Sequence, residues 1–174
     1  MFWKRCMSAN SLKKVNRIDN LSSVLRLLFL SALVALGCSP ILAQTAAQAN
    51  LPTVRLQVGN IFFEAEVADE ETERSTGLMF RKTLAPDAGM LFVMPQTGPV
   101  GFWMKNTGVP LTIAYLDASG RILELHDLVP YNEKIVSSHF PHIAYALEMP
   151  QGWFTKNNIW PGERLIGLPK AGGK

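Results

Sequence analysis

The chain has 174 residues, 48% of them hydrophobic, which is enough for one globular domain with a buried core. Its positive net charge is concentrated at the N-terminus, where residues 1–43 hold six Lys or Arg and one acid. Residues 44–174 hold 11 Lys or Arg against 13 Asp or Glu. Because a slightly acidic domain binds polyanions poorly, the charge pattern excludes nucleic acid as a partner.

The N-terminal segment has the order of a secretory signal peptide. A basic, polar stretch over residues 1–26 is followed by an uncharged apolar run over residues 27–36 and then by small residues. The run is shorter than the roughly 20 residues that a transmembrane helix needs, so we expect no membrane span in the mature protein. Cleavage is expected after Ala43 or Ala49, and lipid attachment at Cys38 is the alternative. The sequence therefore predicts a periplasmic or secreted protein.

The boundaries of the domain follow from composition. The signal peptide is assigned to residues 1–43, and the chain's two cysteines, Cys6 and Cys38, both lie in it. The rest of the chain can be neither a thiol enzyme nor a Cys-ligated zinc protein. Residues 44–52 are rich in Ala, Gln and Thr, which predicts a flexible linker. A single domain is expected over residues 53–168, followed by a disordered tail over residues 169–174.

The domain should begin with a hairpin and a short helix. Strand-like apolar residues occur over 54–58 and 61–67, and the Gly-Asn pair between these runs predicts a β-hairpin. Asp69 is placed to cap a helix of about two turns, with acidic residues in its first turn. Gly77 is placed to end this helix in the left-handed conformation.

The remaining elements are mostly strands. The apolar run at residues 90–94, closed by Pro95, predicts a strand buried on both faces. Residues 152–158 are expected to hold one helical turn. Further strands are expected at residues 111–116, 121–125, 144–149 and 164–168. Seven or eight short strands with one or two short helices predict a mainly β (α+β) fold, built as a compact barrel or sandwich.

The most distinctive stretch, residues 102–107, looks like a strand running from core to surface and carries four candidate ligand-binding residues: Phe102, Trp103, Lys105 and Asn106. Aromatic rings beside a cation and a carboxamide suit the wall of a pocket for a small anionic or carboxylate ligand. The other candidates are Arg74, Arg81 and Glu148. The alternative is that these cations pair with Glu148, Glu124 or Glu70 and fasten the helix to the sheet.

Metal binding has weaker support. The three histidines are His126, His139 and His142, and the last two lie three residues apart in an expected loop. No third ligand can be named, so we predict structural or surface histidines, no metal site and no cofactor. A lesser alternative is Cu(I) bound by thioethers, although methionine more often fills gaps in cores. The methionines concerned are Met79, Met90, Met94, Met104 and Met149.

Four motifs then occur in a fixed order: Glu73-Arg74-x-x-Gly77-Leu78-Met79-Phe80-Arg81, Gly89-Met90-Leu91-Phe92, Phe102-Trp103-Met104-Lys105-Asn106-Thr107 with Pro110-Leu111, and Leu147-Glu148-x-Pro150-x-Gly152. Together they resemble the domain of unknown function number 192 family, over roughly residues 53–168. The resemblance implies a compact, mostly β fold with a short helix and no established activity. Family members typically carry Asp after the Pro-Leu pair, where this chain has Thr112. A catalytic carboxylate there would be lost or moved in this protein, whereas a locally paired one could be replaced by Thr112.

Two classes of function follow from these observations. The first is a non-catalytic binding module for a small ligand or an envelope protein. The sequence does not determine its oligomeric state. The second is an enzyme that acts on a cell-envelope or small-molecule substrate through Arg, Lys and Glu side chains. A cleft in which Glu148 and Lys105 face each other within hydrogen-bond reach would favour the enzyme hypothesis, whereas a filled, flat surface would favour a structural or interaction role. No nucleophile elbow and no phosphate-binding Gly-rich loop is present to favour hydrolase or nucleotide chemistry.

Overall fold

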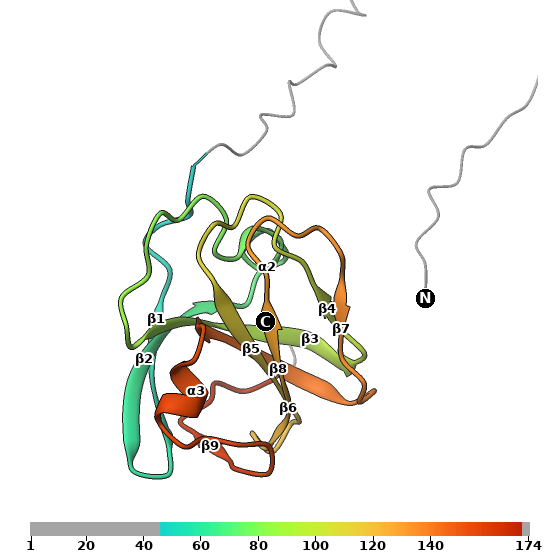
Figure 1. Cartoon of the computed structure of the whole chain (residues 1–174). Coiled ribbons are helices and arrows are strands. Elements are labelled where there is room, and N and C mark those ends of the chain that lie inside the picture. The colour runs from blue at the N-terminus through green and yellow to red at the C-terminus, as the bar shows by residue number, and fades with distance from the viewer. Residues whose placement is uncertain (1–45, 172–174) are drawn as a thin grey trace, which may run out of the picture. The chain divides into compact units, whose positions relative to one another are not determined.

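The computed structural model describes residues 46–171, which contain nine strands and two short helices (Figure 1). The predicted signal peptide, with Cys38 and Ala43, lies outside the described residues. The strands are β1 (Thr53–Val58), β2 (Ile61–Ala68), β3 (Ala88–Gly98), β4 (Gly101–Phe102), β5 (Leu111–Leu116), β6 (Ile122–Leu128), β7 (Val136–Ser137), β8 (Ile143–Pro150) and β9 (Leu165–Ile166). The helices are α2 (Glu71–Thr76) and α3 (Trp153–Lys156). Neither helix in this range has the length and apolar character needed to cross a membrane.

Seven of these strands form one curled sheet in the order β6-β5-β8-β3-β2-β1-β9 (Figure 1). Only β2 and β3 pair in parallel, and the other neighbours are antiparallel. The two outer strands, β6 and β9, approach each other at one end. There the backbones of Arg121 and Arg164 form an isolated antiparallel bridge, and the Ile122 N–H donates to the Glu163 carbonyl over 2.8 Å. The sheet is thus a half-barrel, and the predicted mainly β, barrel-like fold is confirmed. Strands β4 and β7 form a separate two-stranded ribbon.

The sheet has an apolar core on each face. One core includes Leu56, Phe63, Leu147 and both aromatic residues of α3, Trp153 and Phe154. The other contains Met90, Phe92, Ile113, Tyr115 and Ala146, with Phe102 of β4 and Val136 of β7 packed against it. Because side chains alternate along each strand, the buried β3, β5 and β8 contribute to both cores. The second core is the one that carries the polar sites described below.

The first hairpin and the first helix lie where the sequence predicts them. Strands β1 and β2 pair across the Gly-Asn turn, as expected. The helix is capped one residue later than predicted, by Glu70 rather than Asp69. The Glu73 carboxylate accepts hydrogen bonds from the backbone N–H groups of Asp69 and Glu70, over 3.0 Å each. Glu70 and Glu73 thus form a capping box, with Glu70 as the N-cap of the helix. Gly77 follows the helix with φ 49° and ψ −133°, outside the left-handed helical region that we expected.

Two strand boundaries also differ from the prediction. Strand β3 continues past Pro95 to Gly98, and Pro95 lies where the pairing of β3 with β8 is interrupted, between Val93 and Gly98. In that gap the missing N–H of proline breaks no ladder hydrogen bond. Residues 102–107 are not a strand beyond Phe102: the chain turns there, and Asn106 has φ 54°. Asparagine tolerates this positive φ better than most residues.

The two ends of the described chain contact the domain. In the expected linker, the Gln48 side chain donates to the carbonyls of Glu73 over 3.1 Å and Gly77 over 2.8 Å. In the expected tail, the Pro169 carbonyl accepts a hydrogen bond from the Tyr145 hydroxyl over 2.7 Å. Both segments therefore contribute specific contacts where the sequence suggested only flexible chain.

Candidate functional site

Two buried carboxylates share one face of the sheet. In the register of the strands, Glu148 on β8 lies beside Ile113 on β5, and Ile113 lies beside His126 on β6. One row further along, Tyr115 on β5 lies beside Glu124 on β6. Since residues two apart point to the same side of a sheet, Glu148 and Glu124 face the same core, with Tyr115 between the two strands that carry them.

The Glu148 carboxyl group is buried without a partner. Its residue is 4% exposed, and it makes no hydrogen bond or ion pair with any residue of the described range 46–171. Burial raises the pKa of Glu148 to about 8 from an ordinary value of 4.5. At neutral pH the group is therefore mostly protonated, and it can donate a hydrogen bond as well as accept one.

This carboxyl group lines a small cavity of about 30 Å³. Four of the seven predicted ligand-binding residues meet there: Arg74, Phe102, Trp103 and Glu148. The Phe102 ring is held edge-on against Phe92, with 4.8 Å between ring centroids, and lies 5.9 Å from the Tyr115 ring. The remaining wall is formed by Ser75, Thr76, Gly77, Leu78, Met79, Phe92 and Thr107. The motifs at residues 73–81, 102–107 and 147–152 thus converge on one place.

Arg74 supplies the positive charge at this cavity. Its Nη1 donates to the carbonyl of Asp69 and, over 3.2 Å, to the carbonyl of Val93, which fixes the guanidinium between α2 and β3. It forms no ion pair with an acidic residue in the part of the chain that the structure describes. The arginine therefore keeps its charge available at the cavity, because backbone carbonyls orient it without neutralising it.

A wider groove adjoins the cavity. It has a volume of about 390 Å³ and shares Arg74, Ser75, Phe102 and Trp103 with the cavity. Its other lining residues are Glu71, Met94, Val100 and Gly101. An apolar groove that ends in a small polar cavity is the usual form of a site for a small amphipathic molecule.

Trp103 and Lys105 form the outer edge of this site. Trp103 is 43% exposed, and the Lys105 Nζ lies 5.1 Å from the centroid of its ring, within cation–π range. Lys105 does not line the cavity and makes no hydrogen bond to Glu148. The facing pair of Glu148 and Lys105 that would favour the enzyme hypothesis is therefore not formed.

Arg81 and Asn106 lie elsewhere. They border a separate hollow of about 370 Å³ together with Phe80, Lys82, Gly108 and Tyr131. Arg81 is bound in a two-pronged ion pair by Glu66, with N–O distances of 2.6 and 2.5 Å. Asn106 accepts a 2.8 Å hydrogen bond from the Phe80 N–H through its backbone carbonyl. For Arg81 the ion-pair alternative fits, although its partner is a glutamate that the sequence analysis did not name.

Thr112 has a local role in the structure. It is 6% exposed, and its hydroxyl donates to the Asp127 carboxylate over 2.6 Å. The same oxygen accepts a longer hydrogen bond, 3.4 Å, from the Gly152 N–H at the start of α3. Thr112 does not line the Glu148 cavity. The departure from the family pattern at this position therefore leaves the cavity residues untouched.

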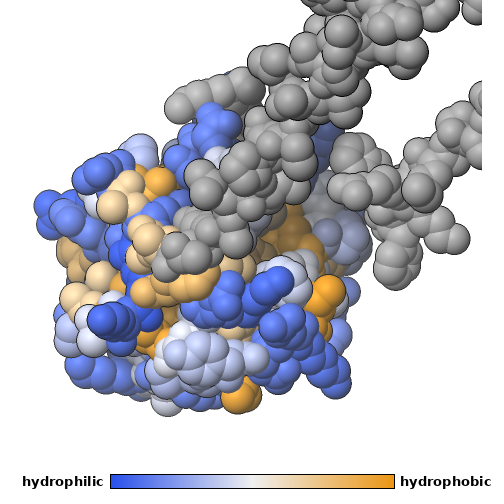
Figure 2. Space-filling view, turned by 90° about the horizontal axis from the view of Figure 1, so that it is seen from above, coloured by the Kyte–Doolittle hydropathy of each residue, from blue (hydrophilic) through white to orange (hydrophobic). Residues whose placement is uncertain are grey.

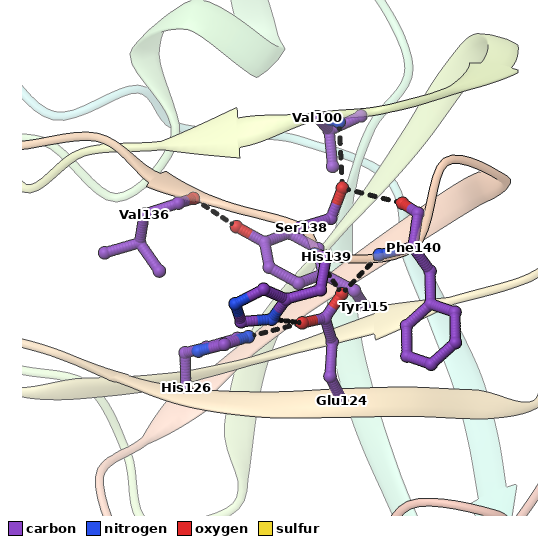
Figure 3. A network of polar contacts seen from close by, with 8 residues as sticks. All are labelled: Val100, Tyr115, Glu124, His126, Val136, Ser138, His139 and Phe140. Atoms are coloured by element: carbon purple, nitrogen blue, oxygen red, sulfur yellow. Dashed lines mark hydrogen bonds and ion pairs between the residues drawn. The ribbon is translucent and has the colours of Figure 1, made fainter.

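A second polar cluster surrounds Glu124, and sequence reasoning missed it (Figure 3). The Glu124 Oε2 lies 2.7 Å from both His126 Nε2 and His139 Nδ1. Burial alone would raise the pKa of Glu124, but hydrogen bonds from the two histidines and from the backbone of Phe140 and His139 lower it overall. The i, i+2 spacing of Glu124 and His126 on a strand could have pointed to this pair, whereas nothing in the sequence connected His139 to them.

The five methionines named above do not gather in one place. Met90, Met94 and Met104 belong to the second core, while Met149 belongs to the core on the other face of the sheet. Met79 lines the cavity near Glu148. The five thioethers therefore do not form one cluster, although three of them share the second core.

The surface around the site is mixed in character. Figure 2 looks onto the end of the domain where α2 and the neighbouring loops lie, and hydrophilic residues there are interspersed with hydrophobic ones. Besides Trp103, the exposed large hydrophobic residues of the described range include Tyr131, Ile135, Phe140 and Trp160. Single exposed residues of this kind are normal for a folded domain.

Comparison with known proteins agrees with this architecture. A solved protein from Sinorhizobium meliloti 1021, provisionally described as a transcription regulator, is 35% identical over 70% of this chain and 98% of its own, with a TM-score of 0.66. A protein of unknown function from Novosphingobium aromaticivorans DSM 12444 is 29% identical over 72% of this chain and 94% of its own, with a TM-score of 0.64. No curated protein matches the chain. Residues 54–167 match the family DUF192, described as Uncharacterized ACR, and the chain belongs to this family.

Proposed function

We propose that this protein is exported and binds a small ligand with an apolar body and a carboxylate or carbonyl end, without catalysis. The ligand end would enter the cavity at Glu148, and the body would lie in the adjoining groove along Phe102 and Trp103. The observation that carries the proposal is the buried carboxyl group of Glu148, which lines the cavity and has no hydrogen-bond or ion-pair partner among residues 46–171. The export part rests on the signal-like order of residues 1–43.

The charges at the cavity favour an acceptor group on the ligand. A protonated Glu148 donates one O–H, and Arg74 offers guanidinium N–H groups beyond those used by Asp69 and Val93. Both groups complement a carbonyl or carboxylate oxygen. Burying Glu148 without a partner costs free energy, and a ligand that supplies that partner recovers part of it.

The volumes of the two spaces set the size of the ligand. The cavity, at about 30 Å³, has room only for a terminal group, whereas the groove, at about 390 Å³, has room for the rest of a small molecule. Arg74, Ser75, Phe102 and Trp103 belong to both. A molecule with one polar end and an aromatic or aliphatic body fits this shape.

The test is a thermal-shift and calorimetric screen with aromatic and short-chain carboxylates and their methyl esters, at pH 6 and pH 9. We expect carboxylates to bind at pH 6 and to lose affinity at least tenfold at pH 9, where ionised Glu148 repels them. Trp103→Ala and Lys105→Gln should weaken binding. Matched controls are Trp160→Ala, at a residue that is 53% exposed outside the site, and Lys134→Gln.

Two results would contradict the binding proposal. The first is the absence of any carboxylate or ester that stabilises the protein at pH 6. The second is a loss of binding in Trp160→Ala that equals the loss in Trp103→Ala, because the ligand would then lie outside the cavity. Export is tested separately, by the N-terminal sequence of the protein recovered outside the cytoplasm, and intact protein confined to the cytoplasm would contradict it.

A second candidate function is general acid catalysis by Glu148 on a bound carbonyl substrate. A carboxyl group with a pKa of about 8 in a cavity is suited to give up a proton near neutral pH. In this case Arg74 would stabilise the negative charge that develops on the carbonyl oxygen. Turnover of an ester from the screen that Glu148→Gln abolishes while binding persists would favour this candidate, and binding without turnover would favour the first.

A further inference from the structure

The cluster of Glu124, His126 and His139 has the composition and convergence of a metal site (Figure 3). One carboxylate oxygen and two imidazole nitrogens all lie within 4.8 Å of one another. Glu124 and His126 project from the same side of β6, and His139 comes from the connection between β7 and β8. We propose that these three residues bind one divalent transition-metal ion, with zinc the first candidate.

The ligand types suit such an ion. Two imidazoles and one carboxylate form a three-ligand set that zinc uses in proteins when a fourth position stays open to water or another molecule. The two ring nitrogens approach the same oxygen, Glu124 Oε2, at 2.7 Å each. Ligand atoms around a tetrahedral zinc lie roughly 3.4 Å apart, given metal–ligand distances of about 2.1 Å. The two nitrogen–oxygen distances therefore need to lengthen by about 0.7 Å to accept the ion.

The second oxygen of Glu124 is already held in place. Its Oε1 accepts the backbone N–H of His139 over 2.8 Å and that of Phe140 over 3.3 Å. Such hydrogen bonds orient a carboxylate ligand and are typical of the surroundings of metal sites. They also fix the backbone of His139 close to the carboxylate, so little further ordering is needed when the ion binds.

Burial of the cluster is graded from inside to outside. The side chain of Glu124 is 9% exposed, that of His126 is 23% exposed, and that of His139 is 79% exposed. Glu124 and His126 would therefore hold the ion at the sheet, and His139 would bind it from the solvent side. The fourth coordination position would face solvent. Tyr115 is not a ligand, because its hydroxyl donates to the Val136 carbonyl over 2.7 Å.

The ion would also fasten one connection to the sheet. His139 belongs to the segment that joins β7 to β8, and Ser138 beside it donates to the Phe140 carbonyl and accepts from the Val100 N–H (Figure 3). A metal bond between this segment and β6 would link parts of the chain about 13 to 15 residues apart. Because the ion binds the folded state, it should raise the thermal unfolding temperature.

The experiment is zinc titration of the full, untagged chain by calorimetry and equilibrium dialysis. Cys6 and Cys38 are replaced by Ser in all samples, since thiolates outside the described residues would also bind zinc. We expect one zinc per chain and a zinc-dependent rise in unfolding temperature. Cobalt(II) in place of zinc should give the visible absorption of a four-coordinate ion.

The variants separate this site from any other. Glu124→Gln, His126→Gln and His139→Gln should each lower zinc affinity at least tenfold. His139→Gln is the safest of the three, because its exposed side chain contributes little to the core. His142→Gln is the matched control, since His142 is the remaining histidine of the chain and stands outside the cluster.

Two outcomes would overturn the proposal. One is the absence of zinc binding at micromolar concentrations in the protein with all three histidines. The other is binding that His139→Gln leaves unchanged, which would place the ion elsewhere. Circular dichroism of the metal-free variants checks that each is folded, so that a loss of binding reports the missing ligand.

Discussion

Glu148 and Glu124 are similar in burial and opposite in environment. They are 4% and 8% exposed, and they lie on the same face of the sheet with Tyr115 between their strands. Glu124 accepts hydrogen bonds from two imidazoles and two backbone N–H groups, and its pKa is lowered. Glu148 accepts none within the described chain, and burial raises its pKa to about 8.

The comparison shows that hydrogen bonding, rather than burial, decides the charge of a carboxyl group in this protein. A buried carboxylate stays ionised when N–H groups replace the water that it loses, and otherwise it takes up a proton. The two residues therefore suit different partners: Glu124 a cation, and Glu148 a hydrogen-bond acceptor. Burial raises the pKa of the Tyr115 hydroxyl most, and the negative charges of Glu124 and Glu148 raise it further, so this phenol stays neutral.

The largest expected effect is on how stability changes with pH. Glu148 has a pKa of about 8 when folded and an ordinary value of 4.5 when unfolded. The folded state therefore holds the proton more tightly, and its stabilisation is present at low pH and lost as pH rises from about 4.5 to about 8. At about 1.4 kcal/mol per pKa unit, this loss is on the order of 4 kcal/mol. Glu148→Gln should remove it, as measured by urea unfolding from pH 5 to pH 8.5.

The control for this prediction is Glu133→Gln, which removes an exposed glutamate and should leave the pH profile unchanged. All samples contain EDTA, so that metal binding does not contribute. Wild type and Glu148→Gln should be similarly stable at pH 5 and differ most above pH 8. Parallel profiles for the two proteins would show that Glu148 is not protonated in the folded state.

The next effect is a smaller loss of stability on replacing Glu124, whose carboxylate, unlike that of Glu148, has hydrogen-bond partners. Glu124→Gln removes the charge that four hydrogen bonds address, and we expect the free energy of unfolding to fall by about 2 to 3 kcal/mol in EDTA. Asp117→Asn is the control, because Asp117 also accepts several hydrogen bonds, though in an exposed turn. It should cost about 1 kcal/mol or less. Equal costs at the two positions would mean that burial adds nothing to the Glu124 cluster.

A third prediction asks whether Tyr115 couples the two carboxyl groups. Its hydroxyl donates to the Val136 carbonyl and not to either carboxylate, so Tyr115→Phe should cost only about 1 kcal/mol. Combined with Glu124→Gln, the two losses should add within about 0.5 kcal/mol. Tyr145→Phe, which removes a similar bond to the Pro169 carbonyl, is the control. A coupling above 1 kcal/mol would contradict independent sites.

Much of the fold could be predicted because it depends on local patterns. The hairpin of β1 and β2, the buried strand that begins β3, and the helix before Gly77 follow from alternation, apolar runs and capping residues. The exceptions have local causes that only three-dimensional pairing reveals. Pro95 does not end strand β3, since it lies where the β3–β8 ladder is interrupted, and no property of residues 95–98 alone could indicate that interruption.

The site could be predicted only in part, because it depends on contacts between distant segments. Arg74, Phe102, Trp103 and Glu148 do meet at one cavity. The ion pair of Arg81 with Glu66 and the meeting of Glu124 with His139 join residues 15 apart in each case. Their spacing has no helical or strand period, so the sequence contained no signal for either pair.

The smallest expected effect on stability, and the closest test of why Glu148 is protonated, comes from Trp103. The residue is 43% exposed and its ring contacts Lys105, so Trp103→Ala should change the free energy of unfolding at pH 5 by less than about 1 kcal/mol. Trp103 also lines the cavity, so we expect its ring to limit the access of water to Glu148. Removing the ring should lower the pKa of Glu148 towards its ordinary value and reduce the loss of stability between pH 5 and pH 8. Trp160→Ala, at a residue that is 53% exposed outside the cavity, should leave that loss intact. If Trp103→Ala keeps the full pH dependence, the enclosing strands alone must desolvate Glu148, and the cavity mouth then has no part in setting its charge.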